Sequence, residues 1–190
     1  MSKVDLLEIK GVQLCSAKVV IDPRGTFTKF YEQGVRPQGG FDPYITSLMT
    51  ASNNDSGTIR GLHFQVPPFE EEKVIICLHG KILDVIVDLR SDSPTRGDWA
   101  SIQLSSDEPQ SLCLPMGIAH GYQTLTPETT VFYALTSEFN QENAYSLHYA
   151  DTDLNIPWPL PARQVSAKDA TGISLSRALL LLKGHDGSGS

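Results

Sequence analysis

Short runs of apolar residues alternate with polar positions along most of the chain, and turn-forming residues interrupt them about every ten residues. A period of two is typical of strands whose successive side chains point to opposite faces of a sheet. Many short strands separated by regular turns indicate an all-β sandwich or barrel. The pattern predicts strands over residues 6–9, 12–21, 26–31 (half buried), 44–51, 58–65, 74–78, 81–89, 99–104, 110–114, 120–125 and 130–136.

Prolines and glycines mark the breaks between these strands. Asp22-Pro-Arg-Gly25 predicts a tight turn, because proline presets φ and glycine tolerates a positive φ. A loop is expected over residues 34–43, where proline and glycine are frequent, and a turn over 53–57. Pro67-Pro68 is expected to end the strand before it, because neither residue can donate a hydrogen bond to a ladder.

The pattern changes after Asp151. Three prolines over residues 156–161 predict an extended segment that packs over the barrel. Residues 174–183 are predicted to form a helix, which Gly184 is expected to end. Residues 1–183 are therefore predicted to form one domain, followed by a flexible tail over 184–190.

Composition narrows the class of protein. A chain of 190 residues with 40% hydrophobic and 19% charged residues is typical of a globular protein with a sizeable core. The net charge of -7 and the pI near 5.1 argue against nucleic acid or an anionic membrane as the main partner. The N-terminus has no stretch of signal-peptide type, and the apolar run 178–182 is far too short to span a bilayer. Three single cysteines without CxxC spacing favour reduced thiols in the cytoplasm.

The stretch from Thr58 to Lys73 carries the densest candidate chemistry. It brings together the guanidinium of Arg60, the imidazole of His63 and the ammonium of Lys73. Gly61 lies where a strand can bulge or admit a ligand to the backbone. Such a segment can bind an anionic substrate through Arg60 while His63 transfers a proton. Taken alone, Arg60 could equally be a surface charge and His63 a structural histidine.

Asp84 is a second candidate. Within the predicted strand 81–89 it shares a face with Ile82 and Ile86, and a carboxylate buried on such a face requires a partner. It is either a satisfied structural acid or part of a functional site.

A proline–glycine–histidine spacing at Pro115 to His120 suggests a cupin-type jelly roll. With the other motifs, the chain resembles the dTDP-4-dehydrorhamnose 3,5-epimerase family, which are nucleotide-sugar epimerases of the cupin superfamily. The resemblance implies an all-β jelly-roll barrel, or double-stranded β-helix, with a short C-terminal helix. It covers roughly residues 8–175, and the matching stretches are Asp22–Gly25, Arg60–Gln65, Lys73, Asp84–Arg90, Ser93–Pro94, Pro115–Gly121, Val131–Tyr133, Ile156–Pro159 and Ser166–Asp169.

Epimerisation beside a ketone needs a base for the α-proton, an electrophile for the enolate and an acid on the opposite face of the ring. The resemblance implies that His63 is the base, oriented by Asp169, and that Tyr133 is the acid. It also implies that Lys73 faces the developing enolate oxygen. The structural alternatives are a core aromatic at Tyr133, an ion-paired surface lysine at Lys73, and a capping box from Ser166 for Asp169. The joint occurrence of these residues in family order favours the catalytic interpretation.

The resemblance implies a wider set of side chains that bind the substrate, a nucleotide diphosphate sugar. Arginines would bind the diphosphate, because a forked cation suits phosphate geometry. A second histidine–acid pair would account for an acid on an isoleucine-rich strand face. The set comprises Arg24 and Arg60 for the diphosphate, His120 with Asp84 as the pair, and Phe27, Lys29, Gln65 and Lys168.

Enzymes of this family use no metal or other cofactor, and none is expected here. Metal-binding cupins usually carry His-x-His in the first motif, whereas this chain reads His63-Phe64-Gln65. A metal-dependent cupin oxygenase is therefore the disfavoured alternative.

Several substrate-contacting positions depart from the family pattern. The family usually has glutamates at Lys29 and Ala144, Gln-Asp-Asn at residues 48–50, and a lysine and a second tyrosine at Ala134 and Glu138. We therefore expect a 4-keto-6-deoxysugar epimerase with a different nucleotide sugar, or one that inverts a single carbon instead of both C3 and C5. A sugar-nucleotide-binding cupin without turnover stays open as an alternative. Family members pair through β-sheets, so a homodimer is expected.

Overall fold

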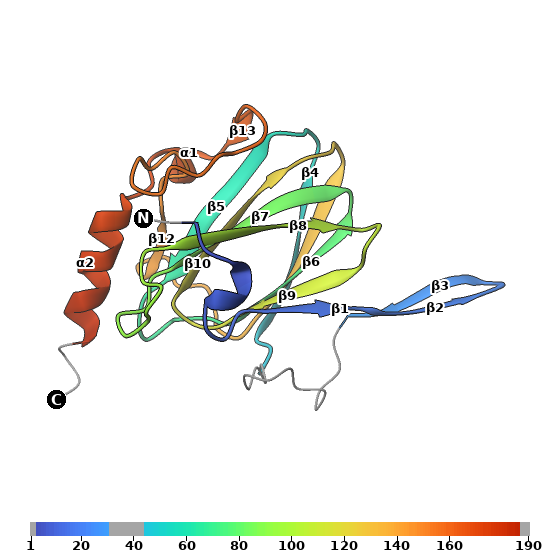
Figure 1. Cartoon of the computed structure of the whole chain (residues 1–190), viewed down its shortest axis with the longest axis horizontal. Helices are drawn as coiled ribbons and strands as arrows, with labels where there is room; N and C mark the ends of the chain where they lie inside the picture. The colour runs from blue at the N-terminus through green and yellow to red at the C-terminus, as the bar shows by residue number, and fades with distance from the viewer. Residues whose placement is uncertain (1–2, 31–43, 187–190) are drawn as a thin grey trace.

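Two largely antiparallel β-sheets face each other and enclose the main apolar core of the computed structural model, which describes residues 3–30 and 44–186 (Figure 1). This arrangement confirms the predicted all-β jelly roll. The first sheet runs β1 (Gln13–Ser16), β9 (Gln110–Leu114), β6 (Lys73–His79), β11 (Thr129–Leu135) and β4 (Ser47–Asn53). The second runs β12 (Ala144–Ser146), β5 (Thr58–Gln65), β10 (Ile118–Thr124), β7 (Lys81–Asp88) and β8 (Trp99–Ser105), and β13 (Gln164–Val165) pairs in parallel with β5.

Alternation along the strands builds the core between the sheets. Ile82 and Ile86 of β7 point inward, and Ile75, Leu112 and Leu114 meet them from the first sheet. All five side chains are fully buried. This burial of apolar surface between the two inner faces is the main stabilising contribution to the barrel.

The outer face of the second sheet is covered by the C-terminal part of the chain. Val85 and Val87 point outward from β7 and pack in one cluster with Ile156 and with Leu175 of helix α2 (Leu175–Asp186). The predicted extended segment over residues 156–161 therefore does lie against the barrel. In Figure 1 the helix stands beside this sheet at the edge of the molecule.

A β-hairpin projects away from the barrel. It consists of β2 (Lys18–Asp22) and β3 (Gly25–Lys29), which pair with each other in a separate two-stranded sheet (Figure 1). Ile21 is 78% exposed and Phe27 66% exposed. Within the described part of the predicted strand 26–31, half-burial is right for residues 28–30, which are partly buried. It is wrong for Thr26 and Phe27, which are exposed because the hairpin leaves the barrel.

Two predicted elements differ from the structure. Residues 6–8 form a 3-10 helix, η1 (Leu6–Glu8), where a strand was predicted. Leu6 and Ile9 are three residues apart and both buried, which fits a helical turn better than a period of two. Helix α2 continues through Gly184 to Asp186, so the prediction that this glycine ends the helix is wrong. A glycine inside a helix costs only about 1 kcal/mol and does not forbid it.

The remaining strands occur close to their predicted positions, although residues 12–21 are divided into β1 and β2 at Ala17. Three short elements were not predicted: β12, β13 and helix α1 (Ala167–Ala170). The predicted loop over 34–43 and the end of the predicted tail, 187–190, lie outside the described residues. Within the described part of the chain, no helix combines the length and the apolar character needed to cross a bilayer.

Candidate active site

A cavity of about 670 Å³ lies between the two sheets. Its walls come from β4, β6 and β11 of one sheet, from β5, β10, β12 and β13 of the other, and from α1. The predicted site residues that line it are Arg60, His63, Gln65, Lys73, His120, Tyr133, Lys168 and Asp169.

A bulge in β5 lets Arg60 and His63 reach the same cavity. Residues three apart point to opposite faces of a regular strand. Here His63 pairs with His120 and Arg60 with Tyr122, so β5 gains one residue relative to β10 and both side chains return to the inner face. Gly61 lies in the bulge with φ of +104°, and a Cβ there would be 2.6 Å from the His120 carbonyl oxygen. The structure thus requires glycine at this position, and of the two alternatives that the sequence left open there, a bulge is present.

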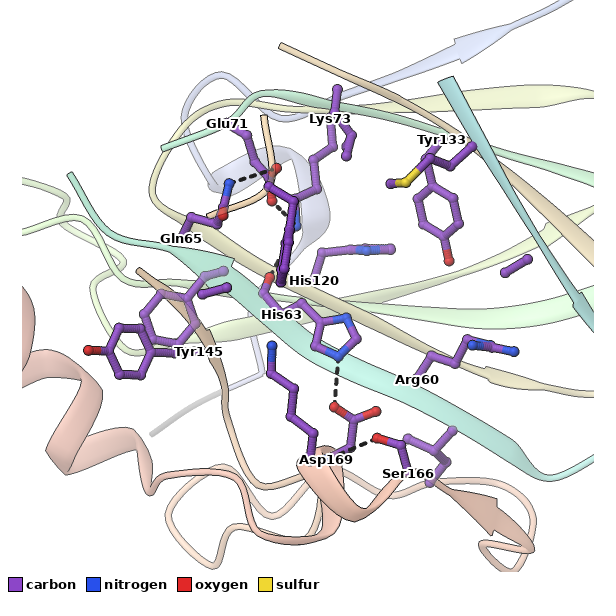
Figure 2. Close-up of a pocket in the computed structure, with 18 of the residues that line it drawn as sticks. Arg60, His63, Gln65, Glu71, Lys73, His120, Tyr133, Tyr145, Ser166 and Asp169 are labelled. Carbon is purple, nitrogen blue, oxygen red and sulfur yellow. Dashed lines mark hydrogen bonds and ion pairs between the residues drawn. The ribbon is translucent and has the colours of Figure 1, made fainter. Parts of the chain in front are cut away.

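His63 is held by Asp169. The His63 Nε2 atom lies 2.7 Å from Asp169 Oδ1, which also accepts from Ser146 Oγ at 2.9 Å, and Gly61 N donates to Asp169 Oδ2 at 3.3 Å. Burial by itself raises the pKa of Asp169, but the hydrogen bonds from His63, Ser146 and Gly61 outweigh it and lower the pKa to about 2. A buried, ionised carboxylate therefore orients an imidazole that is 44% exposed (Figure 2).

The short helix α1 places Asp169 through its cap. Ser166 is the N-cap residue, and its Oγ accepts a hydrogen bond from Asp169 N at 3.1 Å. The carboxylate of Asp169 turns to His63. The cap thus uses the backbone of Asp169, and its side chain is left to pair with His63.

Asp84 and His120 form a second pair deeper in the barrel. His120 Nε2 lies 2.8 Å from Asp84 Oδ2, and their side chains are 4% and 0% exposed. Burial raises the pKa of Asp84 above its ordinary value, although His120 and Lys73 oppose this effect. His120 lines the cavity and Asp84 stands behind it, so the acid can act on a ligand only through its histidine.

Tyr133 enters the cavity from the sheet opposite to His63. It belongs to β11, and Figure 2 shows its ring and the His63 imidazole reaching into the same space from different strands. Its ring meets the His120 ring edge-on, with centroids 6.1 Å apart. Burial raises the pKa of Tyr133 well above its ordinary value, and Tyr122 and Asp84 act in the same direction. The phenol is therefore protonated at neutral pH, as a general acid must be.

Lys73 faces the cavity as half of a buried ion pair. Its Nζ atom lies 3.0 Å from Glu71 Oε1 and donates to the His63 carbonyl oxygen at 3.2 Å. The side chain is 6% exposed. Lys73 is thus ion-paired, as its structural alternative required, but it is not a surface lysine.

A hydrogen bond to Asn53 holds the guanidinium group of Arg60 in place. Its Nε atom donates to Asn53 Oδ1 at 2.8 Å, which uses one of the five N–H groups of the guanidinium. Because this hydrogen bond orients the planar group at the cavity wall, Arg60 can present a forked pair of donors to an anion.

The sequence profile of the dTDP-4-dehydrorhamnose 3,5-epimerase family matches residues 6–177. The chain belongs to this family. The dTDP-4-dehydrorhamnose 3,5-epimerase of Sinorhizobium fredii (strain NBRC 101917 / NGR234) is 34% identical over 175 residues, which cover 89% of this chain and 87% of the relative.

Two solved structures show the same fold. The dTDP-4-dehydrorhamnose 3,5-epimerase of Bacillus anthracis str. Ames, with TDP and PPi bound, has a TM-score of 0.82 and 36% identity over 86% of this chain and 93% of that one. A 3'-monoepimerase from Streptomyces bikiniensis in complex with dTDP-quinovose has a TM-score of 0.83 and 27% identity over 95% and 90%. These comparisons confirm the predicted family and the predicted enzyme class, a carbohydrate epimerase.

Three predicted substrate-binding residues of the epimerase lie on the projecting hairpin and do not line the cavity of their own chain. Arg24 at the hairpin turn is 90% exposed and pairs with Asp22 at 2.6 Å. Phe27 and Lys29 belong to β3.

Gln65 of the epimerase lines the cavity, but its amide bonds within the protein. Its Nε2 atom donates to Phe69 O, Glu71 Oε2 and Glu138 O, and its Oε1 atom accepts from Asn140 N. The residue thereby ties two loops together beside the cavity. Among residues 3–30 and 44–186, no group of three or more His, Cys, Asp or Glu side chains could hold a metal ion.

Sequence reasoning missed several residues of the epimerase site. Ser146 supports Asp169, Glu71 pairs with Lys73, and Asn53 holds Arg60. Phe139 lines the cavity, and Lys168 Nζ lies 5.6 Å from the centroid of its ring. Glu71 stands two residues before Lys73, so the acidic run at 70–72 was an available signal, whereas the distant partners Ser146 and Asn53 left none.

Proposed function

We propose that this epimerase inverts C3, C5 or both in a nucleoside-diphosphate-4-keto-6-deoxysugar, in deoxysugar biosynthesis. The observation that carries the proposal is a base and an acid on opposite sheets of one cavity: His63, held by Asp169, on β5, and Tyr133 on β11. The relatives named for dTDP sugars, and the solved relatives with TDP or dTDP-quinovose bound, support a nucleoside diphosphate sugar as the substrate class.

The first step is removal of an α-proton by His63. Because Nε2 bonds to Asp169, the nitrogen available to the substrate is Nδ1. The electron pair of the broken C–H bond forms an enolate with the C4 carbonyl. Asp169 stays ionised throughout and stabilises the imidazolium, as in other histidine–acid pairs.

The enolate oxygen requires a positive partner. Lys73 is the proposed partner, because its buried ammonium lines the cavity beside the carbonyl group of His63. The ion pair with Glu71 partly neutralises the positive charge of Lys73, which weakens its attraction for the enolate, but it also fixes the position of the ammonium group. His120, whose Nε2 bonds to Asp84, also lines the cavity, and its Nδ1 would donate a second hydrogen bond to the enolate when that nitrogen carries a proton.

Tyr133 then returns a proton to the carbon. The O–H bond of the phenol breaks, a C–H bond forms on the face opposite to His63, and the enolate collapses to the ketone. Solvent afterwards takes a proton from His63 and returns one to the tyrosine. Each step uses side chains of the chain alone, so the proposed mechanism requires no cofactor.

The diphosphate would bind at Arg60, whose guanidinium is oriented by Asn53. With a net charge of -7, the protein as a whole repels an anionic substrate, so local cations must outweigh this repulsion. Lys168, next to Asp169 and above the ring of Phe139, adds a second cation to the cavity wall.

A homodimer completes this assignment. The hairpin β2–β3 exposes apolar side chains away from its own barrel, and within residues 3–30 and 44–186 β4 pairs on one side only, with β11. A second copy would bury the hairpin and cover the sheet edge. Arg24 and Phe27 would then bind substrate in the partner's cavity.

The three free cysteines, two of them buried, support a reducing compartment such as the cytoplasm.

Inversion of one centre is slightly favoured over two. The exposed Glu138, which replaces a tyrosine of the family pattern, is not a cavity-lining residue, whereas its neighbour Phe139 is. Phe139 therefore provides the aromatic side chain near Tyr133 that a tyrosine at position 138 would provide in the family pattern. This difference changes the shape of the cavity in which the sugar must reorient after the first inversion.

The test is NMR of dTDP-4-keto-6-deoxyglucose with the protein in heavy water. We expect deuterium to enter C3, C5 or both, with inversion. Tyr133→Phe keeps the packing of the ring and removes the acid, so it should still wash deuterium into unepimerised substrate while product formation falls steeply. Nucleotide binding without any exchange would instead identify a binding cupin, and unchanged product formation by Tyr133→Phe would refute the assignment of the acid.

A further inference from the structure

The two histidine–acid pairs of the cavity differ in the surroundings of their carboxyl groups. Asp169 accepts hydrogen bonds from three donors, which occupy both of its oxygens. Asp84 makes one hydrogen bond, between its Oδ2 atom and His120 Nε2 at 2.8 Å. Among residues 3–30 and 44–186, its buried Oδ1 atom finds no hydrogen-bond partner. This difference bears on which ring nitrogen of His120 carries a proton.

The surroundings of Asp84 favour a neutral group. The residue lies on β7 between Ile82 and Ile86, which belong to the main core, and Ile102 of β8 lies opposite to it. Asp84 itself is 0% exposed. A carboxylate at this position would lose its hydration without full replacement, whereas a protonated carboxyl group carries no charge that needs solvation.

Lys73, from β6 of the facing sheet, is a cation that favours an ionised Asp84. Its ammonium group lies 3.0 Å from Glu71 Oε1, and that carboxylate partly neutralises it. Lys73 and His120 therefore oppose the effect of burial without outweighing it, and the pKa of Asp84 stays above its ordinary value.

Tyr122, Tyr133 and Cys77 also face Asp84, and all three are neutral at pH 7. Tyr122 lies opposite to Asp84 on β10, while Tyr133 and Cys77 belong to β11 and β6. Burial raises the pKa of each of these groups. The Tyr122 hydroxyl is engaged by Asn53, whose Nδ2 atom donates to it at 3.1 Å. These groups thus add no positive charge that would stabilise a carboxylate.

The pair of Asp84 and His120 can hold its protons in three ways. With an ionised acid and a neutral ring, the ring proton stays on Nε2, and the lone pair of Nδ1 faces the cavity in which an enolate must form. With an ionised acid and an imidazolium, two charges are separated where one carboxylate oxygen is unsatisfied. A protonated acid instead donates to Nε2, so the neutral ring carries its proton on Nδ1. The third arrangement alone combines a donor toward the cavity with no buried charge.

We propose that Asp84 is protonated in the working enzyme and is a positioning residue: its hydroxyl donates to His120 Nε2 and holds the neutral ring with a proton on Nδ1. The inference rests on the proposed function, in which an enolate forms at C4. The Nδ1–H group donates a hydrogen bond to the enolate oxygen and keeps its proton, because a neutral imidazole is a far weaker acid than an imidazolium. Neutral imidazole serves as such an electrophile in other enzymes that form enolates. The proton that completes the inversion therefore comes from Tyr133.

The same two residue types thus have opposite functions in one cavity. Asp169 is ionised, with a pKa of about 2, and it holds the proton of His63 on Nε2, so Nδ1 of that ring can accept a proton. Asp84 is proposed to hold the opposite tautomer, so Nδ1 of His120 can donate. Environments that shift two carboxyl pKa values in opposite directions are typical of sites that need both an acceptor and a donor.

The first test observes the protons in the protein without substrate. Infrared spectra with isotope-labelled aspartate should contain the carbonyl band of a protonated carboxyl group at pH 7, and this band should be lost in Asp84→Asn and kept in Asp169→Asn. Nitrogen NMR of the histidine rings should show His120 neutral, with its proton on Nδ1. An absent band would overturn the proposal, and so would an imidazolium or a proton on Nε2. A buried water that keeps Asp84 ionised would give the first of these results.

The second test compares the same substitution in the two pairs. An asparagine amide can donate to His120 Nε2 as a protonated carboxyl group does, so Asp84→Asn should lower deuterium entry into dTDP-4-keto-6-deoxyglucose less than about tenfold. Asp169→Asn should lower it about ten-thousandfold, because the amide holds the ring of the base in the wrong tautomer. A loss beyond about tenfold in Asp84→Asn, as removal of a charge would give, would overturn the proposal.

Asp84→Leu separates the donor from the space that the side chain fills. Leucine suits the apolar surroundings but cannot donate to His120, so deuterium entry should fall further than in Asp84→Asn, with the midpoint of urea unfolding reported for both variants. Equal losses in the two variants would show that the donor does not position the ring. If the wild-type protein shows neither deuterium entry nor product with 4-keto-6-deoxysugars, the proposed function fails, while the spectra still decide the protonation of Asp84.

Discussion

His63 combines an imidazole exposed to the cavity with a nitrogen held by a buried carboxylate. His63→Ala removes the base, while the hydrogen bonds of Asp169 from Ser146 and Gly61 persist. We expect solvent exchange at the sugar carbons to fall about a hundredfold to ten-thousandfold. The affinity for dTDP and the midpoint of urea unfolding should stay near those of wild type. Exchange at the wild-type rate would remove His63 from the mechanism.

The contribution of Asp169 to the stability of the protein at low pH can be measured with a single substitution. Its pKa falls from 3.8 to about 2 on folding, so the stabilisation is present above the unfolded-state value and is lost as the pH falls through the folded-state value. A shift of this size corresponds to roughly 2 kcal/mol of unfolding free energy. Asp169→Asn should therefore show a flatter decline of that free energy with falling pH in urea titrations. The same decline as wild type, or an equal change in the exposed control Asp92→Asn, would contradict this assignment.

At the residue scale, local patterns revealed the candidates but not their partners. His63 and Asp169 are 106 positions apart, and Asn53 and Tyr122 are 69 positions apart. The first pairing followed from the family resemblance, because no periodicity links residues so distant. The second involves side chains outside the motifs of that resemblance, so it became visible only when the strands were placed next to one another.

The bulge in β5 is the element on which the site depends most. Gly61→Ala adds a Cβ 2.6 Å from the His120 carbonyl oxygen at φ of +104°, whereas Gly25→Ala, at φ of +125°, meets nothing within 4 Å. Both variants carry backbone strain of about 1–3 kcal/mol, but only the first adds a clash. Urea unfolding should show the larger loss for Gly61→Ala, together with loss of exchange as Arg60 and His63 are displaced. Equal losses in the two variants would show that β5 absorbs the extra atom.

At the element scale, the period of two located most strands because one face of each packs on the core. The pattern failed where an element is too short to show a period, as in β12 with three residues and β13 with two. It also failed at residues 6–8, where Leu6 and Ile9 are both buried by a 3-10 turn. The prediction that Gly184 ends the C-terminal helix failed because a glycine inside a helix has only a modest energetic cost.

At the scale of the whole molecule, the chain separates a barrel of two facing sheets from a hairpin that leaves it (Figure 1). The barrel contains His63, Tyr133 and Asp169, while Arg24 lies at the hairpin turn. The sequence motifs include residues from both the barrel and the hairpin. They do not show whether the two parts of one site come from the same copy of the chain. The proposed dimer therefore assigns one site to two chains, and light scattering should give twice the mass of 20.8 kDa.

Complementation between a weakened and an inactive variant tests this division of the site. Arg24→Ala should weaken turnover through loss of a diphosphate contact, and His63→Ala should abolish it. In a mixed dimer, the barrel of the Arg24→Ala chain keeps its base and receives an intact hairpin from the His63→Ala chain, so one cavity of the two is fully native. Mixing the variants after reversible dissociation should therefore restore activity, up to about one quarter of wild type for random pairing of equal amounts, since half of the dimers then carry one native site in two. If Arg24 instead served its own chain, every cavity in the mixture would lack either the base or the arginine, and mixing would restore nothing.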